Sequence, residues 1–123
     1  MDRKKILLVD DSSTVLLMER MILSKSQYDV VTARDGVEGL EKARAERPDL
    51  ILMDVVMPRM DGFEAVKQLR AGDATREIPV IMVTTRGELS SVETGYANGC
   101  NDYVTKPING LELLAKVRSC LGQ

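Results

Sequence analysis

The sequence contains no histidine and no tryptophan, and it has only one phenylalanine and three tyrosines. Without histidine, the chain offers no imidazole base for catalysis and no imidazole ligand for a metal ion. Its only cysteines, Cys100 and Cys120, do not form a C-x-x-C motif. We therefore expect two small thiols, buried or half-buried, in a reducing compartment.

Long apolar runs and blocks of positive charge are missing as well. No apolar run approaches the roughly 18 residues of a membrane-spanning helix. The N-terminal stretch "MDRKKILLVDD" reaches acidic residues after only four apolar ones, which is unlike a signal peptide. We therefore expect a cytoplasmic protein without membrane insertion. The net charge of −2 and the lack of a basic cluster argue against direct nucleic-acid binding.

The chain has 123 residues, of which 44% are hydrophobic. This length fits one compact domain over residues 1–123 and is too short for two typical domains. The hydrophobic content is sufficient for a core that needs neither disulfides nor a structural metal.

Apolar stretches of strand length alternate with stretches of helical spacing. The helical spacing is clearest in three sets, Val15, Met18 and Ile22, then Phe63, Val66 and Leu69, then Leu111, Leu114, Val117 and Leu121. The expected strands are "KILLV" near the N-terminus and the segments from Tyr28, Asp49, Ile78 and Asp102. Five such units predict an α/β fold with a doubly wound, five-stranded parallel sheet, (βα)5.

Turn and capping residues stand at the joints between these stretches. "DDSS" at 10–13 offers N-caps to the first helix, and "RDG" at 34–36 and "MDG" at 60–62 mark turns before helices. "ERPD" at 46–49 should end the second helix, because the residue before a proline disfavours helical geometry.

Carboxylates follow the strands at one edge of the predicted sheet. The first strand leads into Asp10 and Asp11, and the third ends at Asp54. In parallel sheets this edge is where ligands bind. Each acid alone could be a helix cap, but three together repel one another, at about 4 kcal/mol for a pair 4 Å apart at an effective dielectric of 20. Lys106, at the end of the fifth strand, supplies one positive charge, and Mg²⁺ suits an all-oxygen site of this kind.

Four motifs, in matching order and spacing, identify a family. They are "LLVDD", "DLILMDVVMPRMDG", "VIMVTT" and "GCNDYVTKP". With them the chain resembles the receiver domain of two-component response regulators over essentially its whole length, in particular the single-domain chemotaxis type. The resemblance implies a flavodoxin-like strand order, 2-1-3-4-5.

The resemblance also implies roles for individual residues. Asp54 corresponds to the phosphoacceptor, a carboxylate nucleophile that forms an aspartyl phosphate. Mg²⁺ would be held by Asp10, Asp11, Asp54 and the backbone carbonyl of Val56. Lys106 would pair with Asp54 and then with the phosphoryl group.

Two further residues correspond to the switch of the family. Thr84 would donate its hydroxyl to a phosphoryl oxygen, and the side chain of Tyr103 would follow the movement of that threonine. The Lys106–Pro107 peptide bond is expected to be cis by the same resemblance.

Three positions near the expected site depart from the usual pattern or flank the path of the attacking water. Thr85 is larger than the residue common there and would narrow access to Asp54. Val56 and Arg86 flank the water path, and we expect them to alter dephosphorylation. The segment 87–99, "GELSSVETGYANG", is rich in weak helix formers. It is either a marginal helix held by packing or an element soft enough to shift with the switch.

These features predict a phosphorylatable signalling switch that is not an enzyme for an outside substrate. A histidine kinase or phosphotransfer protein would donate the phosphoryl group. An unknown target would bind the face formed by the fourth helix, fifth strand and fifth helix, and the unphosphorylated protein would be a monomer without an output domain.

Alternatives remain open from the residues alone. The chain could be a scaffold of the same fold that is never phosphorylated, or a domain of a larger regulator. A hydrolase with an aspartyl-phosphate intermediate is a further alternative, but it would commonly have an acid at position 56, which is Val56 here. The first helix carries more apolar residues than one buried stripe requires; either its core face is broad or part of it is exposed toward the kinase.

Overall fold

The computed structural model describes residues 3–85 and 89–123. Five strands form one parallel sheet in the order β2-β1-β3-β4-β5, which confirms the expected topology. Their bounds are β1 Lys5–Val9, β2 Asp29–Ala33, β3 Leu50–Asp54, β4 Val80–Thr85 and β5 Asp102–Lys106.

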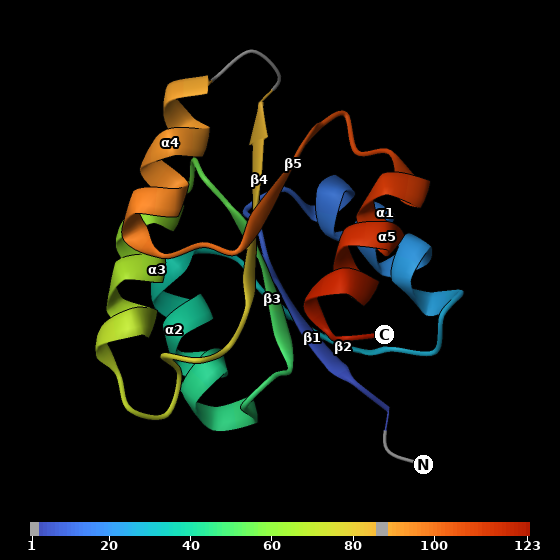
Figure 1. The fold of residues 1–123 in the computed structure, drawn as a ribbon, viewed down its shortest axis with the longest axis horizontal. Helices are drawn as coiled ribbons and strands as arrows, with labels where there is room; N and C mark the ends of the chain where they lie inside the picture. Colours follow the sequence, from blue (N-terminus) through green and yellow to red (C-terminus); the bar gives the residue numbers. More distant parts are fainter. Residues whose placement is uncertain (1–2, 86–88) are drawn as a thin grey trace.

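The helices cover both faces of this sheet. Figure 1 shows α1 and α5 on one face and α2, α3 and α4 on the other. The bounds are α1 Ser13–Ser24, α2 Gly36–Glu46, α3 Gly62–Ala71, α4 Leu89–Asn98 and α5 Gly110–Cys120. Neither part of the chain that the structure describes contains a helix long and apolar enough to cross a membrane.

Capping side chains set the starts of four helices, three of them at the turn motifs that the sequence predicts. Ser12, Asp35, Asp61 and Asn109 each accept a hydrogen bond from a backbone N–H in the first turn of the helix that follows. The second helix ends at Glu46, and Arg47 caps it in the left-handed region with φ 47°. The proline motif thus ends that helix where it is expected to.

The core consists of two apolar clusters, one on each side of the sheet. Along β1, Leu7 and Val9 face α2 and α3, whereas Ile6 and Leu8 face α1 and α5. Because side chains alternate along a strand, the residues two positions past Leu8 and Leu52 also face α1 and α5. Those residues are Asp10 and Asp54, so the alternation alone aims both carboxylates at the same side.

The buried face of α1 differs from the expected spacing. The residues buried there are Leu16, Glu19 and Leu23, not the set that begins at Val15. Leu17, Met18 and Met21 are instead exposed, so part of this apolar helix does face solvent, as one of the two interpretations holds. In α5, Leu113 and Val117 are buried while Leu111 is 82% exposed.

Candidate functional site

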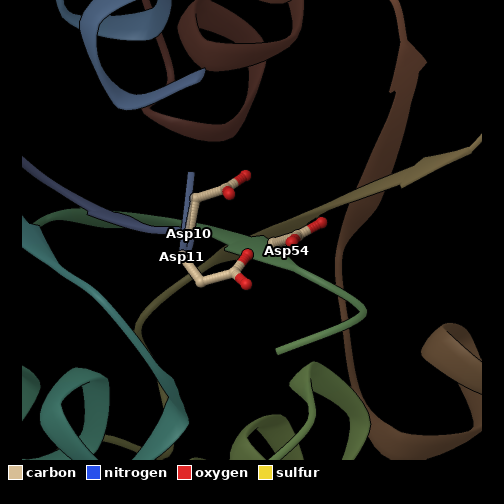
Figure 2. Close-up of side chains that lie close together, drawn as sticks. All are labelled: Asp10, Asp11 and Asp54. Carbon is tan, nitrogen blue, oxygen red and sulfur yellow. The ribbon is translucent and has the colours of Figure 1, made fainter. Parts of the chain in front are cut away.

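Three carboxylates meet at the carboxyl edge of the sheet. Asp10 and Asp11 follow β1, and Asp54 is the last residue of β3. One oxygen from each lies within 4.8 Å of the others, and Figure 2 shows the carboxyl groups gathered in one place. The structure therefore brings together all three acids that the sequence places at this edge.

The backbone around Asp54 is fixed on both sides. The N–H of Val55 donates to the carbonyl of Val83 in β4 at 3.2 Å, and the N–H of Gly62 donates to the carbonyl of Val55 at 2.8 Å. A Cβ on Gly62 would lie 2.2 Å from the carbonyl oxygen of Asp54. Only glycine permits this approach of α3, which closes the β3–α3 loop beneath the carboxylate.

Lys106 is the cation of the site. Its Nζ lies 3.1 Å from Asp54 Oδ1 and 3.4 Å from Asp10 Oδ2. The Lys106–Pro107 peptide bond is cis, as expected. Lys106 comes from the end of the edge strand β5, so its ammonium reaches across β4 to the acids at the ends of β3 and β1.

Burial and neighbouring negative charge disfavour ionisation of Asp54. Its side chain is almost fully buried. Burial raises its pKa most, the charge of Asp10 raises it further, and Lys106 opposes both, so that the pKa rises to about 6. For Lys106, burial lowers the pKa, but attraction to Asp54 and Asp10 outweighs burial, and the pKa is raised.

Asp10 has one satisfied and one unsatisfied oxygen. Its Oδ1 accepts a hydrogen bond from the N–H of Ser12 at 2.9 Å. Its Oδ2 is buried and makes no hydrogen bond of good geometry among the described residues; it has only the long ion pair with Lys106 Nζ at 3.4 Å. A buried carboxylate oxygen with so little compensation is costly. This oxygen, with two further carboxylates beside it, fits a hard cation such as Mg²⁺.

A fourth carboxyl group borders the site, and the sequence interpretation missed it. Glu19 on α1 is 1% exposed, and its Oε1 has no hydrogen-bond partner in the described part of the chain. Burial raises its pKa to about 8, helped by Asp10 and Asp54 and opposed by Lys106. The signal was present, because Leu16, Glu19 and Leu23 follow helical spacing and share one face.

The structure describes three more of the predicted residues, Thr84, Thr85 and Val56, on the segments that end at this edge of the sheet. Thr84 is buried near the end of β4, one position past the residue paired with Asp54. Thr85 is exposed and pairs in register with Lys106, and Val56 is 72% exposed. Arg86 lies outside the described residues.

Tyr103 is half-buried on β5 and is held from two sides. Its ring packs edge-to-face with Tyr96 of α4, with centroids 6.3 Å apart. On the other side, Lys116 Nζ of α5 lies 4.6 Å from the ring centroid, donates to the Tyr103 carbonyl and pairs with Asp102 at 3.4 Å. The aromatic ring thus connects α4, β5 and α5.

Comparison with known protein families gives one match. The model of the response regulator receiver domain matches residues 6–118. Protein PilH of Pseudomonas aeruginosa is 40% identical over 117 residues, which cover 95% of this chain and 97% of PilH. The alkaline phosphatase synthesis transcriptional regulatory protein PhoP of Bacillus subtilis is 42% identical over 96% of this chain. The chain spans about half the length of PhoP and of several other curated relatives.

Solved structures agree with this match. Chemotaxis protein CheY4 of Vibrio cholerae superposes with a TM-score of 0.91 at 38% identity, covering 98% of this chain and 100% of that one. The receiver domain of sensor histidine kinase PA1611 from Pseudomonas aeruginosa also gives 0.91, at 30% identity, covering 99% and 100%. That structure holds a magnesium ion in its active-site cleft.

Proposed function

Since this chain belongs to the response regulator receiver domain family, we propose that it is a phosphorylatable switch of a two-component system and that Asp54 is its phosphoacceptor. The observation that carries the proposal is the contact of a buried Asp54 with Lys106, beside two more carboxylates. A buried carboxylate with a raised pKa, a cation and converging acids is the arrangement expected for a functional group rather than a structural ion pair.

The chemistry is a phosphoryl transfer to the Asp54 carboxylate. An Asp54 oxygen attacks phosphorus, an O–P bond forms, and the P–N bond of a donor phosphohistidine breaks with its electron pair leaving on the donor. With a small acyl phosphate, the bond that breaks is P–O. Lys106, already 3.1 Å from Asp54, stabilises the charge on the transferred group. Water later attacks the same phosphorus, the bond between phosphorus and the Asp54 oxygen breaks, and inorganic phosphate leaves with the carboxylate restored.

The residues that fit Mg²⁺ are Asp10, Asp11, Asp54 and the backbone carbonyl of Val56. When bound, the ion would neutralise charge that builds up on the phosphoryl oxygens. The chain's own part is to hold three carboxylates within 4.8 Å of one another and to keep Asp54 fixed between β4 and α3. The attacking carboxylate and the acids around it are therefore already in position before the phosphodonor binds, as this reaction requires.

Thr84 and Tyr103 would transmit the effect of phosphorylation to the surface of the domain. The Thr84 hydroxyl would donate to a phosphoryl oxygen, and Tyr103 would follow it. Because Tyr103 contacts both Tyr96 and Lys116, a change of its position would alter the surface of α4, β5 and α5. We propose this face as the binding site of the downstream protein.

The remaining partners and the setting follow from the same proposal. The donor is a histidine kinase or phosphotransfer protein in the cytoplasm, and the exposed apolar residues of α1 form part of its docking face. We propose that the domain is a monomer when unphosphorylated and that it does not itself bind nucleic acid. Motility or chemotaxis is one setting, because PilH and CheY4 are among the similar proteins.

The lifetime of the phosphate would depend on Val56, Thr85 and Arg86. Val56 follows Asp54 by two positions and is highly exposed, so its apolar side chain would flank water that approaches the phosphate from solvent. The decay of phosphorylated protein should change in a Val56→Asn, Arg86→Ala double variant, measured by loss of the phosphoryl mass over time. An unchanged decay rate would remove both residues from this role.

The decisive experiment is intact-mass measurement after incubation with Mg²⁺ and acetyl phosphate. The wild type should gain about 80 Da, the mass of one phosphoryl group replacing a proton on a carboxylate, whereas Asp54→Asn should gain nothing. A gain in both proteins would place the phosphate elsewhere. If neither gains mass, Thr85→Ala is tested next: a gain there means that Thr85 blocks access, and no gain means that the chain is an interaction scaffold.

A further inference from the structure

The loop between β2 and α2 touches both of the loops that carry the candidate site. On one side lies the β1–α1 loop with Asp11, and on the other the β3–α3 loop with Val56. The two contacting residues, Arg34 and Asp35, are neighbours in the sequence. Arg34 contacts a backbone carbonyl and Asp35 contacts the side chain of Arg59, so both act on the loops that carry the cluster.

Asp35 forms a forked ion pair with Arg59 of the β3–α3 loop. Arg59 Nε donates to Asp35 Oδ2 at 2.9 Å, and Nη2 donates to Oδ1 at 3.0 Å. The same carboxylate caps α2, because Oδ1 accepts a hydrogen bond from the N–H of Glu38 at 2.9 Å. A forked pair fixes orientation as well as distance, so Arg59 ties its loop to the rigid start of a helix.

The backbone of the β3–α3 loop packs closely against the start of α2. Arg59 has φ 67°, an unfavourable conformation for a residue other than glycine that persists only where neighbours hold it. A Cβ on Gly36, the first residue of α2, would lie 2.5 Å from the carbonyl oxygen of Met60. The absence of a side chain at Gly36 thus lets the loop lie directly against the start of α2.

Arg34 makes the matching contact on the other side. Its Nη2 donates to the backbone carbonyl of Asp11 at 3.1 Å. Adjacent residues of one loop therefore hold the backbone of Asp11 and, through Arg59, the loop that contains Val56. These are the two loops on which a cation at the carboxylate cluster would depend.

We propose that Arg34, Asp35 and Arg59 are positioning residues that set the spacing between Asp11 and the Val56 carbonyl for a divalent cation. Groups that orient ligands without touching the metal commonly matter nearly as much as the ligands. The inference rests on the proposed function, because it assumes that the cluster binds Mg²⁺. It adds a role for three residues outside the cluster.

The direction of the effect separates positioning from charge. Removing Arg59 takes a positive charge away from the surroundings of the cation site, and by charge alone Mg²⁺ would then bind more tightly. Loss of positioning predicts the opposite, weaker binding. Arg76 is a matched control, because its side chain is 61% exposed against 60% for Arg59 and it pairs with Asp73 in the α3–β4 segment, away from the site.

The test is the Mg²⁺ dissociation constant, measured by isothermal titration calorimetry on the full chain. Arg59→Ala should weaken binding about tenfold, the lower end of the loss seen when outer-shell partners of metal ligands are removed. Arg76→Ala should leave it unchanged. In the double variant Arg59→Ala, Asp35→Ser the formal charge equals that of the wild type and serine still caps α2. It should bind no more weakly than Arg59→Ala alone.

A second variant and a second readout keep the result clear. Arg59→Lys keeps the positive charge but cannot form the forked pair, so it should also weaken Mg²⁺ binding. This variant decides the test if circular dichroism shows that Arg59→Ala does not fold. In phosphorylation by acetyl phosphate, Arg59→Ala should raise the Mg²⁺ concentration at half-maximal rate and leave the rate at saturating Mg²⁺ unchanged.

The outcomes also separate the inference from the function. A wild type that binds no Mg²⁺ overturns both. A wild type that binds Mg²⁺, with Arg59→Ala binding it equally or more tightly, overturns only the positioning role. Equal weakening in Arg59→Ala and Arg76→Ala overturns it as well.

Discussion

The buried carboxyl groups of Glu19 and Asp54 lower the stability of the folded protein as the pH rises. Both carboxyl groups are buried beside Asp10, and burial is the main cause of both raised pKa values. In each case the native state holds a proton at a pH where the unfolded chain has released it. Stability contributed by such a group is present below the unfolded-state pKa and is lost as the pH rises toward the folded-state pKa.

Replacing Glu19 by glutamine should therefore stabilise the protein increasingly as the pH rises. The pKa of Glu19 rises from 4.5 to about 8, so the relevant window runs from about pH 4.5 to pH 8. Because one pKa unit corresponds to about 1.4 kcal/mol, we expect the gain of Glu19→Gln over wild type to grow by at least ~1 kcal/mol between pH 5 and pH 8. Urea unfolding followed by circular dichroism measures it.

The matched control is Glu41→Gln, which removes the same charge from an exposed position on α2. It should show no such growth. A gain for Glu19→Gln that stays constant from pH 5 to pH 8 would mean that Glu19 does not hold its proton in the folded protein.

Asp54 predicts that Mg²⁺ binding depends on pH. With a pKa of about 6 in the absence of a cation, Asp54 is largely protonated at pH 5 and ionised at pH 7.5, and a proton competes with the metal for its oxygens. Calorimetry should show at least about tenfold weaker Mg²⁺ binding at pH 5 than at pH 7.5. Asp54→Asn should bind Mg²⁺ more weakly than the wild type at pH 7.5, and its affinity should depend much less on pH. If both proteins show the same pH dependence, the titrating group is not Asp54.

At the scale of elements, α4 is formed largely by residues of low helix propensity. It contains Val92, Thr94 and Gly95, each a weaker helix former than alanine. A Cβ on Gly95 would meet Cys100 Sγ at 3.2 Å, which shows that glycine lets this helix pack closely on the start of β5. α4 therefore depends on its tertiary contacts more than on its own propensity, and Tyr96 connects it to Tyr103.

Hydrogen exchange should distinguish α4 from α5. We expect the amides of residues 92–98 to exchange faster than those of α5, because little local propensity supports α4. Beryllium fluoride with Mg²⁺, as a mimic of the phosphoryl group, should slow exchange in α4 and β5. Exchange that is equally slow in both helices and insensitive to the mimic would show that α4 is not part of a switch.

At the scale of the whole molecule, the sheet brings together charges that are far apart in the sequence. Asp10, Asp54 and Lys106 lie at the carboxyl ends of three strands, and they share one edge because all five strands are parallel. Burial of the two apolar clusters on either side of the sheet stabilises the fold and offsets this concentration of negative charge. A cation at the edge would then stabilise the native state as a whole.

Saturating Mg²⁺ should raise the melting temperature. A ligand at one hundred times its dissociation constant stabilises the native state by about 2.7 kcal/mol. For a domain of this size each kcal/mol shifts the melting temperature by roughly 4 °C, so the expected rise is about 10 °C. Asp54→Asn should show a smaller rise at the same Mg²⁺ concentration; the absence of any rise in the wild type would exclude a cation-binding cluster.

The fold, the strand ends and most of the site follow from local patterns. Alternating strand and helix signals predicted the parallel sheet, and Asp10, Asp54 and Lys106 were assigned to its edge because each follows an apolar strand. Capping residues such as Asp35 and Asp61 follow from turn chemistry, which depends only on near neighbours in the sequence. The proposal that Asp54 is a phosphoacceptor came from the resemblance of four motifs, not from any single residue.

Only the tertiary structure decided the rest, because it depends on which helix face meets the sheet. In α1 the apolar residues surround the helix, so their spacing could not show that Leu16, Glu19 and Leu23 are the buried set. The contacts of Arg34 with Asp11 and of Arg59 with Asp35 join segments 23 and 24 residues apart. No local pattern encodes such pairs, since they exist only after β1, β2 and β3 have aligned and brought their loops to one edge.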